Sequence, residues 1–325
     1  MPSIILHRVN DFSQSTEPSR GSGLNNILLN RGHRYSFLLC GLLSVLLSIN
    51  VKASNEVTVF SYPYVANNQG IYKSYNHQLL LLALEKTVKT HGPFSMNYIQ
   101  YQMNEKRRRI EALKNTHPNF IISIVGDKNT FSQFAYSPFP NDLGLLGFRF
   151  LLHHKDNSGH FSHETTLEQL QPLDVVQGEG WFDSDVLRMN GFHSVMEVPS
   201  RSIGQMISFK RADLYFSSLV DVDKSRGGEV IVNPNVMLFY LSPRFFVSAK
   251  KNSAAIERIY TGLTLAYQDG SLEQLMDNTF LEKLKKFKIL NRKVLELENK
   301  NLEGLDQRYF LWRGASKSYI DTRTN

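Results

Sequence analysis

Residues 174–191 read DVVQGEGWFDSDVLRMNG, and their order of residue types is that of a strand, a glycine loop and a helix. Asp174–Gln177, with the β-branched apolar pair Val175 and Val176 at its centre, is predicted to be a strand. Gly178–Gly180 follows as a turn, and a helix is predicted from about Asp183 to Asn190. Gly191 is suited to end that helix, because glycine readily adopts the left-handed conformation common at helix C-termini. Strand, loop and helix in this order are the recurring unit of α/β proteins with parallel sheets.

The same alternation continues on both sides of this stretch. In the second half of the chain it predicts a helix near 202–210 and strands at 147–154, 194–198 and 213–217. In the first half it predicts helices at 76–91 and 104–115 and strands at 57–62, 94–100 and 119–125. The pattern then becomes helical, with one helix at 254–267 and a charged helix from 271 to about 299. Two α/β units with parallel strands and right-handed crossovers are therefore expected.

Composition narrows the class of protein. The chain has 325 residues, 42% of them hydrophobic and 21% charged, which is ordinary for a globular protein of about two domains. A mean hydropathy of -0.28 excludes a protein with several membrane spans. The single cysteine excludes an internal disulfide framework and a cysteine-built zinc site.

Residues 31–53, RGHRYSFLLCGLLSVLLSINVKA, have the order of a secretory signal peptide: a basic start, an apolar run and short side chains at Val51 and Ala53. The apolar run is shorter than the ~20 residues of a spanning helix, so an uncleaved anchor is the weaker alternative. We expect a disordered extension at 1–30, cleavage after Ala53 and export to the periplasm. The removed segment carries five basic and two acidic residues of the 37 and 30 in the chain. The remaining net charge of +4 is too small to favour a nucleic-acid partner.

Three stretches together resemble the family 3 solute-binding proteins, the periplasmic components of amino-acid-type uptake systems. The first, FAYSPFPNDLGLLGFRF at 134–150, is similar to the family's aromatic-Ser-Pro turn and crossing strand. The second runs from Leu170 through the glycine loop to MISFKRADLYF at 206–216. The third, from Phe245 to Ser271, looks like the returning hinge strand and closing helix. The order of the three matches the family over about residues 56–285.

The resemblance implies a type II periplasmic-binding-protein fold, in which two α/β lobes with mostly parallel sheets are joined by two hinge strands. The first lobe would comprise 54–146 and 245–285, the second 147–244, with a C-terminal helix and tail at 286–325. The ligand would lie in the cleft between the lobes, which would close by hinge motion. The implied function is capture of a small polar solute for an inner-membrane permease or a sensor, with an amino-acid-like molecule as one candidate. We expect a monomer without cofactor.

The glycine loop and two tyrosines are the first candidates for the ligand site. Gln177 and Gly178 precede a helix, where backbone N–H groups can hold an anionic group, although a plain turn explains the glycine equally well. Trp181 could form a wall of the ligand site or pack within the lobe. Tyr62 and Tyr64 follow the first strand, at the edge where α/β sheets bind ligands, although they could equally pack the loop around Pro63.

Two departures from the family leave the ligand open. Amino-acid-binding members carry an arginine after the third strand of the first lobe, but Thr130 stands there, and Lys128 is the only nearby cation. The acid that would bind an amine after the lobe-two strand is replaced by Ser218, with Asp221 three residues farther on. Ser123, Lys128 and Ser218 complete the expected ligand-binding residues.

Other motifs are weaker. His160 and His163 could chelate a metal, but their stretch reads as a solvated loop, so no metal site is expected. The basic run Lys106–Arg109 is most simply the solvated face of a helix, with an anionic partner as the alternative. The common catalytic signatures are absent, so we expect no enzyme; a hydrolase is the least favoured hypothesis. The main alternative to solute transport is an interaction or sensory protein with a degenerate ligand site.

Overall fold

The computed structural model describes residues 56–302 except 65, 68–69, 72–73, 101–104 and 226–227. The expected extension at 1–30, the signal peptide at 31–53 with its cleavage site after Ala53, and the end of the C-terminal tail lie outside the described residues. Among the helices that are described, none is long and apolar enough to cross a membrane.

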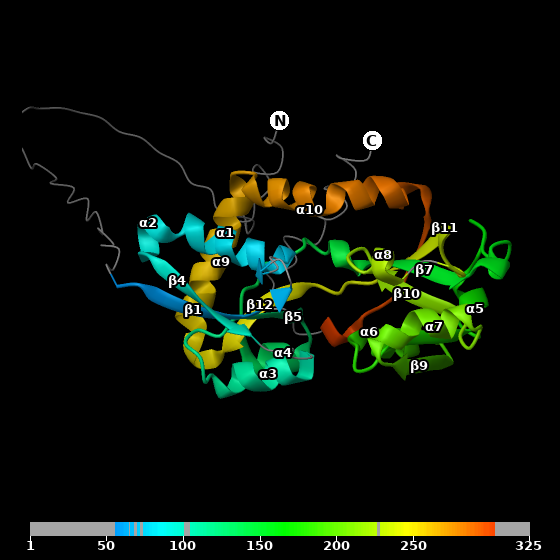
Figure 1. Cartoon of the computed structure of the whole chain (residues 1–325), viewed down its shortest axis with the longest axis horizontal. Coiled ribbons are helices and arrows are strands. Elements are labelled where there is room, and N and C mark those ends of the chain that lie inside the picture. Colours follow the sequence, from blue (N-terminus) through cyan, green and yellow to red (C-terminus); the bar gives the residue numbers. More distant parts are fainter. Residues whose placement is uncertain are drawn as a thin grey trace, which may run out of the picture. The chain divides into compact units, whose positions relative to one another are not determined.

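Strands and helices alternate along most of the described chain (Figure 1). The strands are β1 (Thr58–Tyr64), β2 (Ala66–Asn67), β3 (Gly70–Ile71), β4 (Phe94–Gln100), β5 (Ile122–Val125), β6 (Phe134–Tyr136), β7 (Phe148–His154), β8 (Asp174–Gly178), β9 (Ser194–Val198), β10 (Leu214–Ser218), β11 (Val230–Phe239), β12 (Arg244–Ala249) and β13 (Lys293–Glu296). The helices are α1 (Tyr75–Lys86), α2 (Val88–His91), α3 (Glu105–Lys114), α4 (Lys128–Gln133), α5 (Leu167–Leu170), α6 (Phe182–Met189), α7 (Ile203–Ser208), α8 (Val222–Ser225), α9 (Ser253–Gln268) and α10 (Ser271–Phe287).

The largest sheet has the strand order β13-β11-β7-β10-β8-β9. Strands β10, β8 and β9 are parallel, and β7 pairs antiparallel with both of its neighbours. Helices α5, α6 and α7 lie beside these strands (Figure 1). Val175 and Val176 of β8 are fully buried, which agrees with the apolar run that predicted this strand.

Besides the two-stranded sheet of β2 and β3, two smaller sheets are built mainly from the first part of the chain, with β12 joining one of them from later in the sequence. β1 pairs parallel with β4, and β12 lies between β5 and β6 and is antiparallel to both. A parallel bridge from Ser61 to Phe120 links the two sheets, and the Ile121 N–H donates to the Ser61 carbonyl at 2.9 Å. The chain therefore passes from these sheets to the large sheet between β6 and β7, and returns between β11 and β12.

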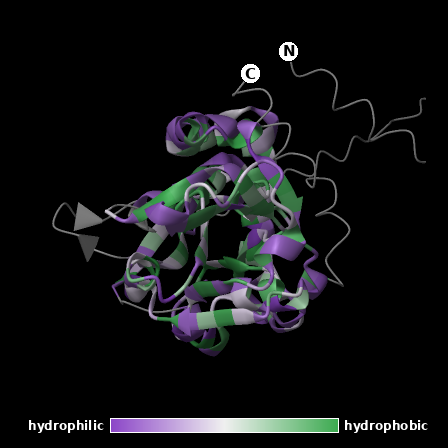
Figure 2. Ribbon diagram, turned by 90° about the vertical axis from the view of Figure 1, so that its right-hand side faces the viewer, coloured by the Kyte–Doolittle hydropathy of each residue, from purple (hydrophilic) through white to green (hydrophobic). Residues whose placement is uncertain are grey.

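Helices α1 and α9 approach each other closely at Gly262. A Cβ atom added to this glycine would lie 1.9 Å from the Ala83 carbonyl oxygen, so only glycine permits the approach. Arg258 of α9 reinforces the contact, since its Nε donates to the hydroxyl of Thr87, the residue that caps the end of α1, at 3.0 Å. The strands carry mostly hydrophobic residues, whereas hydrophilic residues are frequent on the outer helices (Figure 2).

Several predicted elements are confirmed, with β4 and β9 matching the expected residues. The helix predicted to extend to about 299 is wrong, because α10 ends at Phe287 and Lys288 has a positive φ of 45°. Residues Lys293–Glu296 instead form β13, which pairs parallel with β11. The charged sequence after Phe287 is compatible with a solvent-exposed helix. Pairing of Lys293–Glu296 with the edge of the large sheet outweighs that local helical preference.

Candidate functional site: an arginine-lined cavity

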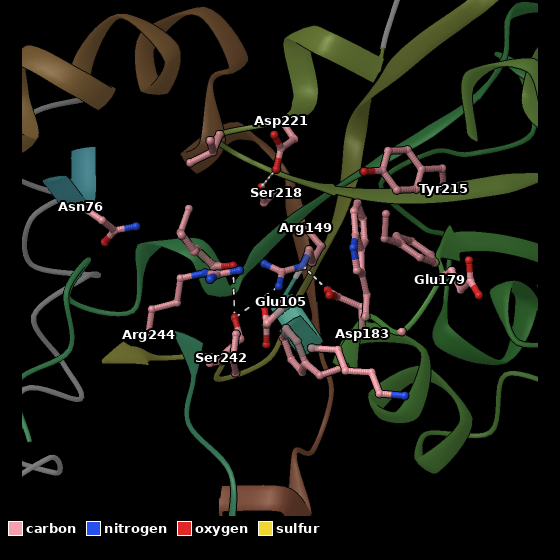
Figure 3. Close-up of a pocket in the computed structure, with 18 of the residues that line it drawn as sticks. Asn76, Glu105, Arg149, Glu179, Asp183, Tyr215, Ser218, Asp221, Ser242 and Arg244 are labelled. Carbon is pink, nitrogen blue, oxygen red and sulfur yellow. Dashed lines mark hydrogen bonds and ion pairs between the residues drawn. The ribbon is translucent and has the colours of Figure 1, made fainter. Parts of the chain in front are cut away.

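A cavity of about 720 Å³ lies among α3, β7, β10, β12 and the β8–α6 loop. Its described lining includes four basic and four acidic side chains (Figure 3), namely Lys106, Arg108, Arg149, Arg244, Glu105, Glu179, Asp183 and Asp221. Trp181, Phe182, Tyr215 and Phe216 add aromatic surface. A cavity lined by charged groups and aromatic rings suits a small polar or charged ligand better than an apolar one.

Arg149 of β7 and Asp183 of α6 form a buried ion pair in the cavity wall. Arg149 Nε donates to Asp183 Oδ1 at 2.8 Å, and the Tyr240 hydroxyl donates to the same carboxylate oxygen. The guanidinium also lies 4.7 Å from the centre of the Tyr240 ring. Burial alone would lower the pKa of Arg149, but Asp183 outweighs that effect and the pKa is raised. Arg149 is therefore a charged, rigidly held group.

One nitrogen of Arg149 is left without a partner. Its Nη2 donates to the Ser242 hydroxyl at 3.3 Å, and that hydroxyl donates to the Leu146 carbonyl at 3.2 Å. Nη1 is buried and has no hydrogen-bond partner in the part of the chain that is described. In Figure 3 the guanidinium groups of Arg149 and Arg244 face each other across the cavity.

Asp142 is buried in the segment between β6 and β7 and interacts electrostatically with Arg244 and Arg149. Its Oδ1 accepts a hydrogen bond from the Gly144 N–H at 3.0 Å, whereas Oδ2 has no partner among the described residues. Burial raises the pKa of Asp142 to about 6, although the Gly144 N–H, Arg244 and Arg149 oppose that shift. Asp142 is thus about half protonated near pH 6, where it balances only part of the arginine charge.

The acidic side chains of the cavity mostly have partners of their own. Asp183 is bound to Arg149, Glu105 accepts from Arg109 Nη2 at 3.3 Å, and Asp221 accepts from the Ser218 hydroxyl at 3.2 Å. Glu179 is exposed at the cavity mouth. In the described ranges, no carboxylate forms an ion pair with Arg108 or Arg244, which leaves two cavity arginines for an external group.

Two of the residues expected from the sequence line the cavity, Trp181 and Ser218. The Trp181 ring lies directly on Gly178: a Cβ there would be 2.3 Å from Trp181 Cε2, so glycine is needed for the indole to pack on the backbone. Gln177 is fully buried and donates to the Phe216 carbonyl at 3.3 Å. Gln177 and Gly178 do not line the cavity themselves.

The N–H groups of the β8–α6 loop are largely used within the protein. The Glu179 N–H donates to the Val198 carbonyl at 2.9 Å, and the Gly180 N–H donates to Glu197 Oε2 at 3.0 Å. The Trp181 N–H donates to the Gly178 carbonyl at 3.1 Å. An external anion at this loop would have to compete with these acceptors.

The two tyrosines lie beside the cavity rather than in its lining. Tyr62 is 7% exposed and stacks on His77, with ring centres 5.4 Å apart. Burial raises its pKa to about 12, against the opposing charges of Arg108 and Arg244, which places Tyr62 within electrostatic reach of both. Tyr64 packs edge-on against Tyr98 at 5.7 Å.

The remaining expected residues, Ser123 and Lys128, are also outside the lining. The buried Ser123 hydroxyl accepts from Asn141 Nδ2 at 3.0 Å, and Lys128 is exposed in the first turn of α4. Thr130, at the position where the family's arginine is expected, is fully buried. Its hydroxyl accepts from Arg109 Nη1 at 2.9 Å, so this position is occupied by an internal contact.

Sequence reasoning missed Arg108, Arg149 and Arg244. Arg149 could have been found, because a charged residue within the apolar strand GFRFLL calls for a buried partner. Arg108 lies inside a basic run that resembles any solvated helix face. The sequence around Arg244 does not indicate that this residue lines the cavity. Its position depends on the pairing of β12 with β5, in which Arg244 lies opposite Val125.

No protein-family model and no curated protein sequence matches this chain. Solved structures do. A probable amino-acid ABC transporter extracellular-binding protein of Bacillus subtilis is 13% identical, with a TM-score of 0.52, and the match covers 69% of this chain and 98% of that one. A histidine kinase sensor domain with similarity to periplasmic binding proteins is 11% identical, with a TM-score of 0.52 and coverage of 70% and 97%.

A third similar structure is an ancestral amino acid-binding protein described as a precursor of cyclohexadienyl dehydratase. It is 14% identical, with a TM-score of 0.51 and coverage of 69% of this chain and 96% of that one. At such low identity the likeness concerns the fold alone. The resemblance read from the sequence is confirmed at that level: the chain has the two-lobed type II periplasmic-binding-protein fold.

Proposed function

We propose that this protein captures a small polar solute in the arginine-lined cavity and presents the bound form to a membrane permease or a sensor in the periplasm. The observation that carries the proposal is the cavity itself. Its volume of about 720 Å³ falls within the ~300–1,000 Å³ typical of small-molecule sites. Its walls hold Arg108 and Arg244 without a carboxylate partner among the described residues, as an open binding site requires.

Closure of the two lobes around the solute would let the permease or sensor distinguish the bound form from the empty form. A solute that contacts β12 and α3 on one side and β10 and the β8–α6 loop on the other would favour the conformation in which all of these surround it. Trp181 and Ser218 would contribute from the second lobe. The protein would act as a monomer, without chemistry of its own and without cofactor.

A purely sensory role is the second candidate. The histidine kinase sensor domain among the similar structures has this fold, so the same cavity could serve signalling rather than uptake. An enzyme is less favoured, because three of the four cavity carboxylates, Glu105, Asp183 and Asp221, accept hydrogen bonds within the protein and only the exposed Glu179 is left among the described lining residues. A catalytic acid or base would need a carboxylate available to the substrate.

The test is a thermal-shift screen of the full chain against amino acids, organic acids, polyamines, sugars and phosphate. A solute present at about a hundred times its Kd should stabilise the folded state by ~2.7 kcal/mol, which raises Tm by several degrees. Small-angle scattering with the same solute should then show a smaller radius of gyration. A well-folded sample whose Tm no solute class raises would contradict solute capture, and turnover of the bound solute would instead favour an enzyme.

A further inference from the structure

Arg108 and Arg244 are brought into one cavity from distant parts of the chain. Arg108 lies on α3, and Arg244 is the first residue of β12, where it pairs in the sheet with Val125 of β5. Both side chains line the cavity and both are half-buried. Neither makes an ion pair within the described residues, in contrast to Arg149, whose charge is balanced by Asp183.

The two guanidinium groups act on each other unfavourably. Burial lowers the pKa of Arg108, and the positive charge of Arg244 lowers it further, whereas Glu105 raises it. Glu105 is itself hydrogen-bonded to Arg109. The other acid that interacts with Arg244, Asp142, is buried and loses part of its charge near pH 6, so below that pH it balances Arg244 incompletely. Two half-buried like charges raise the free energy of the empty protein.

A further donor faces the same space. Asn76, at the start of α1, lines the cavity, and its side-chain oxygen accepts a hydrogen bond from Asn141 Nδ2 at 3.3 Å. That contact fixes the amide so that its NH₂ group is directed toward the cavity, as Figure 3 shows. The buried Nε of Arg108 also has no hydrogen-bond partner in the described ranges.

We propose that Arg108 and Arg244 together bind an oxyanion group of the solute, a carboxylate or a phosphate, with the Asn76 amide as an additional donor. This inference rests on the proposed function and specifies which chemical group of the solute anchors it. An oxyanion would accept charge-assisted hydrogen bonds from both guanidinium groups and would remove their repulsion at the same time. Binding energy therefore comes from two sources, new contacts and relief of an existing conflict.

The arrangement also excludes other groups. An ammonium group would meet two positive charges, and a neutral sugar would leave both guanidinium charges unbalanced. The oxyanion anchor would lie on α3 and β12, whereas Thr130, after β5, is closed off by its contact with Arg109. The rest of the solute would extend toward Ser218 and Trp181.

The test compares the full-length wild type with Arg108→Gln and Arg244→Gln. The matched control is Arg107→Gln on the same helix, because Arg107 is exposed and pairs with Glu111 at 2.8 Å outside the cavity. Tm is measured in potassium chloride and in potassium succinate, L-glutamate and phosphate at equal ionic strength, with putrescine and glucose as cationic and neutral probes. Calorimetry then gives Kd for each probe that raises Tm.

We expect at least one oxyanion probe to raise the Tm of the wild type and of Arg107→Gln. The same probe should bind Arg108→Gln and Arg244→Gln at least tenfold more weakly. In chloride alone the two cavity variants should be at least as stable as the wild type, because each removes one of two repelling charges; this also shows that they fold. The two substitutions lie on different elements, so the test does not depend on one of them.

Three results would overturn the inference, and they separate it from the proposed function. If glucose or putrescine binds the wild type and both cavity variants equally, solute capture stands and the oxyanion anchor is wrong. If an oxyanion probe binds all four proteins with the same Kd, the anchor lies elsewhere. If no probe raises the Tm of the wild type, both the inference and solute capture of these classes are contradicted.

Discussion

Arg149 Nε lies 2.8 Å from Asp183 Oδ1, and both side chains are at least nine-tenths buried. The pair joins β7 to the first turn of α6 and holds one wall of the cavity. Burying two charges is favourable only when each satisfies the other, so the loss of one partner leaves a buried charge uncompensated.

Arg149→Met should therefore destabilise the protein by ~3–5 kcal/mol, since Asp183 would remain buried without its cation. Urea denaturation followed by circular dichroism measures this difference. Arg188→Met is the control, because Arg188 pairs with Glu197 at 2.8 Å but is largely exposed, and its loss should cost less than ~1 kcal/mol. If both substitutions lowered the free energy of unfolding by the same amount, burial of the Arg149–Asp183 pair would not add to its contribution to stability.

The pKa of Asp142 gives a pH prediction. The folded protein raises this pKa from 3.8 to about 6, so the folded state holds the proton more tightly than the unfolded state. The contribution of Asp142 to the free energy of unfolding is therefore complete below pH 4 and is lost as the pH rises through about 6. A shift of about two units corresponds to ~3 kcal/mol.

Asp142→Asn removes that dependence, because asparagine stays neutral. We expect the variant to be more stable than the wild type by ~2–3 kcal/mol at pH 8 and nearly equal to it at pH 4. Urea denaturation at both pH values measures the difference, with Asp185→Asn as an exposed control. A variant that is less stable than the wild type at pH 8 would mean that the charged form of Asp142 is the one the fold needs.

Gly178→Ala should displace the Trp181 indole, because the new Cβ would lie 2.3 Å from the ring. The indole is a side chain that can move, so the protein should fold with a destabilisation of ~1–3 kcal/mol. The tryptophan emission of the variant, corrected with Trp181→Phe in both backgrounds, should shift to longer wavelength. Gly204→Ala has open space around its Cβ and should leave the emission unchanged.

Gly262→Ala tests the contact between α1 and α9. The added Cβ would meet the Ala83 carbonyl at 1.9 Å, and a backbone atom cannot yield as a side chain does. The helices must separate, which should cost ~1–3 kcal/mol or more and lower Tm despite the better helix propensity of alanine. Gly159→Ala, where a Cβ has free space, should leave Tm almost unchanged. An unaltered Tm for Gly262→Ala would mean that the helices adjust without loss.

The sequence predicted the elements whose pattern is local. The run at 94–100 alternates and 194–198 lies between turn signals, so both strands were found with their bounds. The strand β11 was missed because Asn233-Pro234-Asn235 interrupts its apolar run. The structure accommodates these residues with a shift in register between Val232 and Met237, where the Asn233 side chain accepts from the Val236 N–H. Such a bulge depends on the neighbouring strand β7 and has no local signature.

The cavity was less predictable than the fold. Trp181 and Ser218 follow strands that the sequence identified, so their placement at a strand edge could be expected. Arg244 reaches the cavity only because β12 pairs with β5, and Arg108 only because one face of α3 turns inward. The positions of Arg108 and Arg244 thus depend on contacts between segments more than a hundred residues apart, and such contacts cannot be predicted from local residue spacing.

The short strand β13 has a consequence for how the two halves of the fold are connected. After α10 the chain returns to the large sheet and pairs with β11, and Phe287 at this junction packs on Phe150 of β7 at 5.0 Å. The two halves are thus connected by three covalent passages instead of two. A third passage ties the halves together at one more point, so it should restrain their relative movement more than two crossing strands alone.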